Sequence, residues 1–229
     1  MLAAYVPQAS TYAGDIDFLF TIITLIVGFW FILTEVIFFA FLKFFKRKDG
    51  VKAKYISGES HEEERWIAIP HYIVIVFDVI LIIGTVLIWK NIKQDMPEPE
   101  VQIKVIAQQW AWTFVHPGVD NKLGTDDDIA LVDELHIKKG KNYQFFLESK
   151  DVMHSFSIPV FRLKQDAVPG RMITGWFNAT KTGEYDIQCA EMCGVAHGIM
   201  GARLFISEEE EHDQWREDQL ALKNKYAVK

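Results

Sequence analysis

Two long stretches of apolar residues dominate the first part of this 229-residue chain. The stretch from Phe18 to Leu42 is interrupted by a few threonines and one glutamate, and that from Trp66 to Trp89 by little more than one histidine and one aspartate. Each is long enough for a helix to cross a ~30 Å hydrocarbon core, although a helix buried in a soluble protein is the alternative. Two such stretches in one chain favour transmembrane helices at 17–43 and 66–90.

The polar segments around these stretches differ in charge. Residues 1–16 contain no lysine or arginine, and the apolar run that follows is too long for the core of a secretory signal peptide. The positive-inside rule therefore places the segment 44–65 in the cytoplasm, and the tail 1–16 and the C-terminal part of the chain outside. The basic residues between the apolar stretches are Lys43, Lys46, Arg47, Lys48, Lys52, Lys54 and Arg65.

Two acidic residues, Glu35 and Asp78, lie inside the predicted spans. Charges within a membrane are costly and usually face a partner or a water-filled cavity. We therefore expect both to pair at an interface with another membrane subunit rather than to transfer protons.

The pattern changes after the second apolar stretch. Residues 91–100 contain two prolines and predict a linker. Region 101–207 consists of short runs rich in β-branched and aromatic residues, broken by Gly, Asn and Asp, which is typical of a β-sandwich or barrel. Trp110, Trp112 and Phe114 alternate, which predicts that they share one strand face. These runs do not by themselves separate an immunoglobulin-like sandwich from a cupredoxin.

The chemistry of the chain is concentrated around its only two cysteines. Cys189 and Cys193 are followed by His197 and Met200, and His154 lies upstream. Thiolate and thioether sulfur are soft donors and imidazole is intermediate, so this set favours copper over calcium, magnesium or manganese. Two thiolates that both point inward can bridge two copper ions, which leaves one histidine for each ion.

Other interpretations of this segment stay open from the residues alone. A disulfide would leave His197 and Met200 without a role. A Cys2His2 zinc site has no use for Met200, and a mononuclear blue-copper site needs only one thiolate. In a dinuclear copper site Met200 would be a weak ligand, and a loop carbonyl, most simply that of Glu191, would complete the coordination.

Three motifs carry a resemblance to a known family, subunit II of haem–copper cytochrome c oxidases. The resemblance covers nearly the whole chain. It implies an N-terminal two-helix transmembrane hairpin followed by an all-β cupredoxin-like sandwich that holds a dinuclear copper A centre. The motifs are His154-Ser-Phe-x-x-Pro159, Lys164-x-Asp166-Ala167-x-Pro169-Gly170-Arg171 and Cys189-x-Glu191-x-Cys193-Gly194-x-x-His197-x-x-Met200.

The resemblance also assigns roles to residues of this chain. It implies copper ligation by the backbone oxygen of Glu191, and a magnesium or manganese ion, shared with subunit I, on the carboxylate of the same residue. Trp110, first in Gln-Trp-x-Trp, is expected to receive electrons from cytochrome c. The side chains expected to bind copper A are His154, Cys189, Cys193, His197 and Met200.

Further matches to the family have simpler alternatives. Glu63 in Glu63-x-x-Trp66 would lie at the cytoplasmic mouth of a proton path, although an acidic run also suits a helix start. Lys164, Asp166 and Arg171 would lie near subunit I, or merely form a turn.

The implied function is electron transfer. Electrons would pass from cytochrome c, or a cytochrome c domain, through copper A to haem in subunit I, which would reduce oxygen to water and pump protons. Subunit III is a further expected partner, and nucleic acid is not expected as one. From residue 91 onward the chain has 22 acidic against 16 basic residues, which suits a basic partner.

The highly charged tail 208–229 predicts an exposed helix. An acidic insertion at 118–128 favours a bacterial plasma membrane, with the copper domain in the periplasm, over the mitochondrial inner membrane.

Other functions are less consistent with the sequence. Quinol oxidase subunits of this fold lack the copper ligands, whereas every ligand position is filled here. Nitrous oxide reductase is a soluble propeller fusion without membrane spans. A copper chaperone would not need the tryptophan or Glu63, and a nitric oxide reductase with a copper A subunit stays open.

Overall fold

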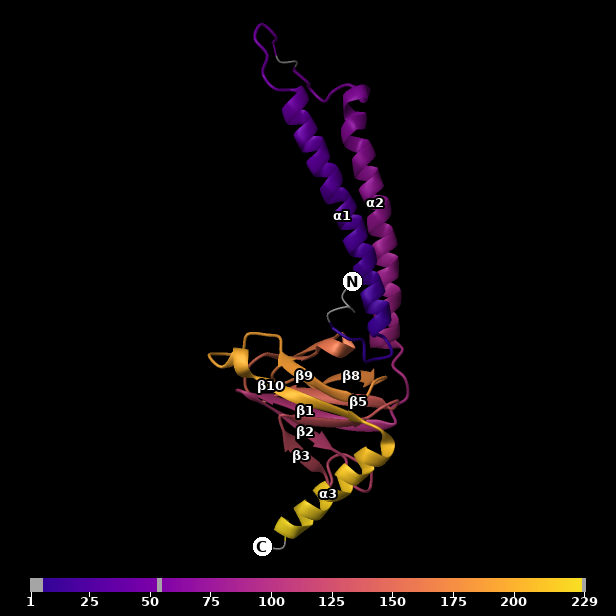
Figure 1. Cartoon of the computed structure of the whole chain (residues 1–229), viewed down its shortest axis with the longest axis vertical. Coiled ribbons are helices and arrows are strands. Elements are labelled where there is room, and N and C mark those ends of the chain that lie inside the picture. The colour runs from indigo at the N-terminus through magenta and orange to yellow at the C-terminus, as the bar shows by residue number, and fades with distance from the viewer. Residues whose placement is uncertain (1–5, 53–54, 228–229) are drawn as a thin grey trace. The chain divides into compact units, whose positions relative to one another are not determined.

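The computed structural model describes residues 6–52 and 55–227, with side chains as far as residue 225 (Figure 1). The chain forms two compact units. One unit comprises residues 18–90, and the other combines the described residues up to Asp17 with those from Asn91 onward.

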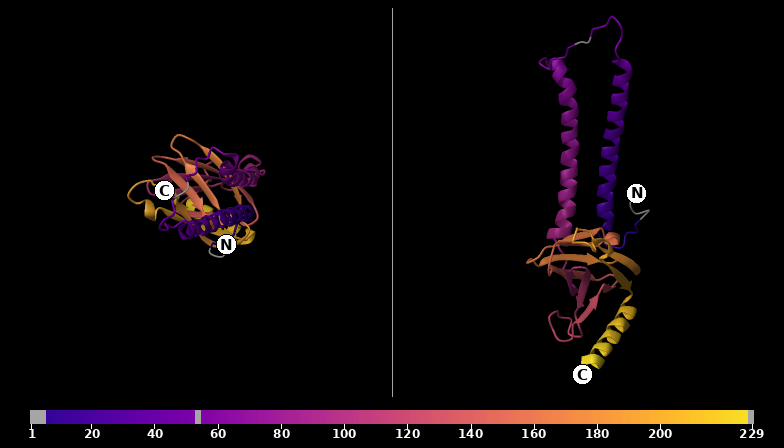
Figure 2. Two further views of the ribbon diagram at one scale, coloured as in Figure 1. Left: turned by 90° about the horizontal axis from the view of Figure 1, so that it is seen from above. Right: turned by 90° about the vertical axis from the view of Figure 1, so that its left-hand side faces the viewer.

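The unit of residues 18–90 is a helical hairpin. Its helices are α1 (Ala13–Phe44) and α2 (His61–Trp89), which run side by side within this unit (Figure 2). Trp30 of α1 lies edge-on to Phe77 of α2, with ring centroids 6.2 Å apart. α2 buries none of its residues, although it is strongly apolar. Such an apolar surface suits a lipid environment, where a helix satisfies its own backbone polar groups.

Both helices begin ahead of the expected membrane spans. α1 begins at Ala13, and α2 begins at His61, ahead of the apolar stretch. The start of α2 is fixed by Ser60, whose hydroxyl accepts the backbone N–H of Glu63 at 3.3 Å and so caps the helix. At its other end α2 continues into a π-helical turn, η2 (Lys90–Gln94). The helices are therefore longer than the apolar stretches that they contain.

The second unit is built on two five-stranded sheets, as the expected all-β sandwich requires. One sheet has the order β3-β2-β1-β5-β8 and the other β4-β10-β9-β6-β7. The pairs β1–β5 and β4–β10 are parallel, and the other pairs are antiparallel. The strands are β1 (Val101–Gln108), β2 (Ala111–His116), β3 (Ile129–Val132), β4 (Glu134–Lys138), β5 (Asn142–Ser149), β6 (His154–Ile158), β7 (Leu163–Ala167), β8 (Ile173–Asn178), β9 (Gly183–Cys189) and β10 (Gly201–Ser207).

Aromatic side chains fill the core of this unit. Burial alternates along β1, β2 and β5, which puts one side of each strand into the interior. Phe156 of β6 packs against Trp112, Phe114 and Phe145 with centroid distances of 5.5, 6.1 and 5.6 Å. The interior links the two sheets, so β6 and the histidine at its start are held rigidly.

Trp110 departs from the expected strand pattern. It lies in the turn between β1 and β2 and is 37% exposed, whereas Trp112 and Phe114 are fully buried in β2. The alternation is therefore wrong at its first member, because the chain reverses direction at Trp110.

Both outer segments of the chain are packed on the sandwich. Ser10 pairs with Ala179, and Asp17 forms a salt bridge with Arg162 at 2.7 Å, so the described part of the N-terminal tail belongs to this unit. The charged C-terminal tail forms α3 (Glu209–Ala227). α3 contacts β3 and β4, so it is not the fully exposed helix that its charge suggests.

Candidate metal centre

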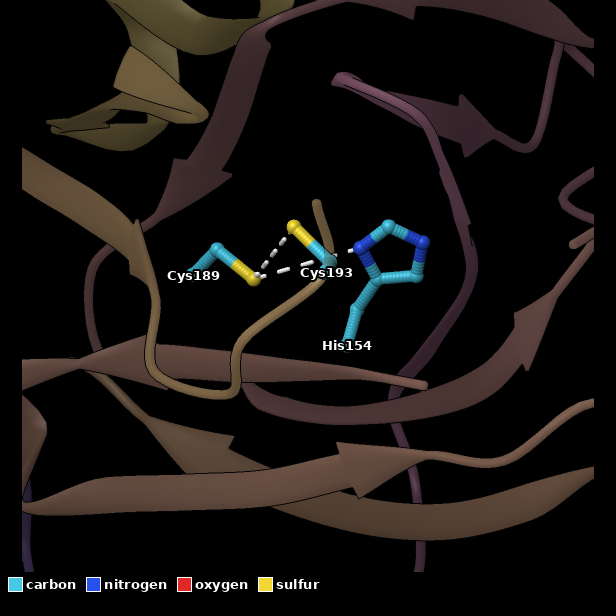
Figure 3. Close-up of side chains that lie close together, drawn as sticks. All are labelled: His154, Cys189 and Cys193. Atoms are coloured by element: carbon cyan, nitrogen blue, oxygen red, sulfur yellow. Dashed lines mark hydrogen bonds between the residues drawn. The ribbon is translucent and has the colours of Figure 1, made fainter. Parts of the chain in front are cut away.

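Three elements converge on the two cysteines. Cys189 ends β9, and the chain returns to β10 through a loop that contains Cys193 and the 3-10 turn η4 (His197–Ile199). His154 is the first residue of β6, the strand paired with β9. The side chains of His154 and both cysteines point toward one another from β6, β9 and the loop (Figure 3).

The three buried donor atoms lie within reach of a single metal site. The sulfur atoms of Cys189 and Cys193 are 3.7 Å apart, and Nδ1 of His154 is 3.9 Å from the Cys189 sulfur. All three ligand atoms lie within 4.8 Å of one another (Figure 3). Within the described residues this is the one group of at least three His, Cys, Asp or Glu side chains that meets this criterion.

The other expected copper ligands approach the same sulfur atoms. Nδ1 of His197 and the thioether sulfur of Met200 lie 3.6 and 3.7 Å from the Cys193 sulfur. The backbone oxygen of Glu191 lies 3.3 Å from the Cys189 sulfur. The six expected donors lie between residues 154 and 200 of the sequence. The fold therefore brings all of them together around the two cysteine sulfurs.

The thiols are free, with a separation that excludes a disulfide. A disulfide bond is about 2.05 Å long, so the 3.7 Å between Cys189 and Cys193 leaves them unbonded. Burial and the neighbouring thiol raise the pKa of Cys193 to about 11. Without a cation this thiol stays protonated at neutral pH, whereas a soft metal ion would displace its proton.

Asp151 is a site residue that the sequence did not single out. Its carboxylate accepts a hydrogen bond from Nε2 of His154 at 2.8 Å, and a second from the backbone N–H of Gln109 at 2.7 Å. Burial alone would raise the pKa of Asp151, but these hydrogen bonds hold it below its usual value. An ionised Asp151 keeps the proton of His154 on Nε2, which leaves Nδ1 free to bind a metal. An acid shortly before a candidate histidine ligand is the signal that could have found it.

The turn between β1 and β2 holds the cysteine loop in place. The side-chain amide of Gln109 donates to the Cys193 carbonyl at 2.7 Å, and the indole N–H of Trp110 donates to the same oxygen at 3.3 Å. Gly194 has φ +123°, and a Cβ there would lie 2.8 Å from the Gln109 amide. Only glycine both adopts this backbone conformation readily and permits this close approach.

Other residues singled out in the sequence lie in different surroundings. Glu63 belongs to the hairpin unit, where its carboxylate accepts the backbone N–H of Gly58 at 3.0 Å next to the cap of α2. Asp166 is opposite Ser155 in the β6–β7 pair, one register position from His154, while Lys164 and Arg171 are exposed.

The donor set fits copper better than zinc. Two thiols, two imidazoles and a thioether match soft-metal preferences, and a structural zinc site would leave the Met200 sulfur without a role. A buried sulfur-rich donor set on a β-sandwich, in a chain with two candidate membrane helices, is the arrangement that a membrane-associated redox metalloprotein requires.

Comparison with known proteins identifies the family. The family model "Cytochrome C oxidase subunit II, periplasmic domain" matches residues 101–205. The alternative cytochrome c oxidase subunit 2 of Bradyrhizobium diazoefficiens is 30% identical over 223 residues, which cover 86% of this chain and 79% of that protein. The chain therefore belongs to the cytochrome c oxidase subunit 2 family. Its cupredoxin-like sandwich and two apolar helices are those that the sequence predicted.

Other relatives have the same description. The probable cytochrome c oxidase subunit 2 of Rickettsia bellii is 32% identical over 228 residues, covering 93% of this chain and 79% of that protein. The solved periplasmic domain of subunit II of cytochrome oxidase (CoxB) of Bradyrhizobium japonicum aligns with a TM-score of 0.46 and 30% identity, over 54% of this chain and 96% of that one. The two curated relatives show that the chain is a subunit 2 of the cytochrome c oxidase type, a component of an oxidoreductase complex.

Proposed function

We propose that this chain is the electron-accepting subunit of its oxidase. It takes electrons from cytochrome c, or a cytochrome c domain, at a dinuclear copper A centre and delivers them to haem in subunit I, where oxygen is reduced to water and protons are pumped. The observation that carries the proposal is the convergence of two free thiols with imidazole and thioether donors at contacts of 3.3–3.9 Å.

The proposed copper ligands are six donors of this chain. When bound, a copper pair would supply a one-electron carrier whose charge change is spread over both metals. The residues around it limit movement: Asp151 fixes the His154 ring, and Gln109 and Trp110 fix the Cys193 carbonyl. A preorganised set of ligands keeps rearrangement small during electron transfer. The donors are the side chains of His154, Cys189, Cys193, His197 and Met200 and the backbone oxygen of Glu191.

Trp110 is the proposed point at which electrons arrive. This residue is 37% exposed, so a docked donor can reach it. Its indole N–H is hydrogen-bonded to the backbone of Cys193, so one hydrogen bond connects the surface to the residue that carries a proposed ligand sulfur.

Contacts with subunit I are proposed for the face that carries Glu191. Its carboxylate is partly exposed and would share a magnesium or manganese ion with subunit I, since hard cations prefer carboxylate oxygen. Lys164, Asp166 and Arg171 belong to the same proposed interface. Subunit III is a further proposed partner.

The charge distribution supports the proposed membrane topology. The basic segment 44–65 would face the cytoplasm and the copper domain the periplasm of a bacterium, which puts the metal where a soluble cytochrome c can reach it. Glu63 stays a proposed proton-path residue, although its contact with the Gly58 backbone also gives it a role at the start of α2.

Metal analysis of the full chain tests the proposal. We expect two copper ions per chain and an EPR hyperfine pattern from one unpaired electron shared by two copper nuclei. The purified complex should oxidise reduced cytochrome c with consumption of oxygen. One copper with a mononuclear spectrum, or zinc in its place, would overturn the dinuclear site, and reduction of nitric oxide instead of oxygen would overturn the assigned reaction.

A further inference from the structure

The indole of Trp215 in the C-terminal helix lies among three imidazoles, two from the sandwich and one from the helix itself. The imidazole cluster consists of His116, His136, His212 and Trp215. His116 ends β2, His136 lies in β4, and the other two residues belong to α3. The cluster therefore joins α3 to both sheets of the sandwich.

The rings are arranged in two ways. His136 is stacked between Phe205 and Trp215, with centroid distances of 4.5 and 4.3 Å and nearly parallel planes. His116 and His212 instead approach Trp215 at interplanar angles of 73° and 58°, with centroids 5.3 and 5.0 Å away. His136 is thus mainly a packing partner, and His116 and His212 flank the anchor.

The two flanking imidazoles are buried without good polar partners. His116 is 4% exposed and His212 is 7% exposed. Nε2 of His116 has no hydrogen-bond partner among the described residues, and the His212 ring lies near the His136 carbonyl without a well-aligned hydrogen bond to it. Burying a charged imidazolium in this environment would be costly, because neither ring has an anion bonded to it.

The charged groups around the cluster are largely paired with one another. Lys138 is 2.7 Å from Asp213, and Arg216 is 3.6 Å from the same carboxylate. Burial lowers the pKa of His136, and Glu134, 3.4 Å from this ring, opposes that shift only in part. Phe205 of β10 contributes an apolar ring. The charged groups that face the cluster are Glu134 and Lys138 from β4, and Glu209, Asp213 and Arg216 from α3.

We propose that docking of α3 is controlled by protons: the helix stays on the sandwich while His116 and His212 are neutral, and their protonation releases it. Trp215 leaves its site between the imidazoles when the helix departs. This device is independent of the copper centre, because it uses none of the proposed ligands.

The direction of the pH dependence follows from burial. Burial, reinforced by nearby positive charge, lowers the pKa of His116 to about 3 and that of His212 to about 4. In a released helix both would return toward the ordinary value of 6.5. The released state therefore binds more protons, so docking is fully favourable above about pH 6.5 and weakens progressively as the pH falls toward the docked pKa values.

Release of α3 would also loosen an acidic loop. Arg216 donates to the Asn121 side chain at 3.2 Å, and Lys223 donates to the carbonyls of Asp126 and Asp128. These contacts tie α3 to residues 117–128, the connection between β2 and β3. Acidification would thereby change how this face of the domain presents its carboxylates.

Hydrogen exchange of the full chain in detergent tests the device. Amide protection in α3 would be measured between about pH 7.5 and pH 5, corrected for intrinsic exchange, with β5 as the internal reference. We expect α3 protection to fall by up to ~30-fold at pH 5 for each imidazole that regains a pKa of 6.5 on release. The window lies above the pKa of Asp213, which its hydrogen bond with Lys138 lowers, so loss of that pair does not contribute.

A double variant separates the imidazoles from other effects of acid. His116→Asn with His212→Gln removes the two imidazoles whose pKa is lowered most, so most of the dependence of α3 protection on pH should disappear whatever its absolute level. The remainder would come from His136, whose pKa burial also lowers. His61→Gln, at a fully exposed histidine of α2, is the matched control and should retain the dependence of the parent chain. Constant α3 protection across this range in the parent chain would overturn the proposal, as would an undiminished pH dependence in the double variant.

Discussion

The sandwich unit contains two histidine clusters that use the same side chain in opposite ways. At the cysteine loop, Nδ1 atoms of His154 and His197 point at the cysteine sulfurs, and Asp151 holds the far side of the His154 ring. In the imidazole cluster, His136 presents its ring face to Trp215. In the first cluster the nitrogen lone pairs point toward the two cysteine sulfurs. In the second cluster the imidazole rings pack against the indole of Trp215.

The difference shows that histidine content alone does not define a metal site. What separates the clusters is the hydrogen bond that fixes one ring nitrogen and frees the other. Asp151 supplies it for His154, but the flanking rings His116 and His212 lack an equivalent carboxylate. The first cluster is therefore suited to metal binding, and the second to packing that fails when the rings become charged.

The largest effect is expected from removing a central sulfur. Cys189→Ser or Cys193→Ser should abolish the EPR signal of an electron shared by two coppers and reduce copper content to one ion or none, because an alcohol does not bridge soft metals as thiolate does. Protection of α3 should stay unchanged. Met192→Leu, at an exposed residue of the same loop, is the control, and a retained two-copper signal in either serine variant would contradict the assignment.

Removing the indole from the other cluster should affect only the helix. Trp215→Ala should weaken docking of α3 by ~2–3 kcal/mol, because its ring contacts three imidazoles but is not fully buried. Hydrogen exchange of α3 measures the loss, with Leu222→Ala on the exposed side of the helix as the control. Unchanged protection in the Trp215 variant would mean that the cluster does not anchor α3.

Asp151→Asn should weaken copper binding without preventing folding. The asparagine no longer provides a negative acceptor for the His154 N–H, and loss of such a partner typically costs ~10–100-fold in metal affinity. Competition with a copper chelator measures this change. Asp126→Asn, at an exposed acid whose side chain makes no hydrogen bond to the described residues, should bind copper like the parent chain. Equal affinities of both variants would show that Asp151 does not tune the ligand.

The smallest predicted change in free energy concerns Trp110. Trp110→Phe should slow oxidation of cytochrome c by about tenfold, equivalent to ~1.4 kcal/mol, because the indole N–H bond to the Cys193 carbonyl is lost. The EPR spectrum of the copper pair should persist. Trp89→Phe, in the hairpin, is the control for a general effect of losing an indole. A parent-like rate with the Trp110 variant would place the arrival of electrons elsewhere.

Local sequence determined much of this protein. Long apolar runs define α1 and α2, because a helix in lipid must satisfy its own backbone and cover itself with apolar side chains. The short alternating runs define a sandwich, and the spacing from Cys189 to Met200 places four proposed donor side chains in one loop. These features depend on neighbours along the chain, so the sequence alone was sufficient to predict them.

Contacts between distant residues were decided only by the tertiary structure. The hydrogen bonds from Gln109 and Trp110 to the Cys193 carbonyl join residues far apart in the sequence, and so does the packing of α3 on His116 and His136. The charge of residues 208–229 suggested exposure, yet one face of α3 supplies His212 and Trp215 to the cluster. A charge pattern records average polarity, whereas burial is decided by which surfaces the completed fold brings together.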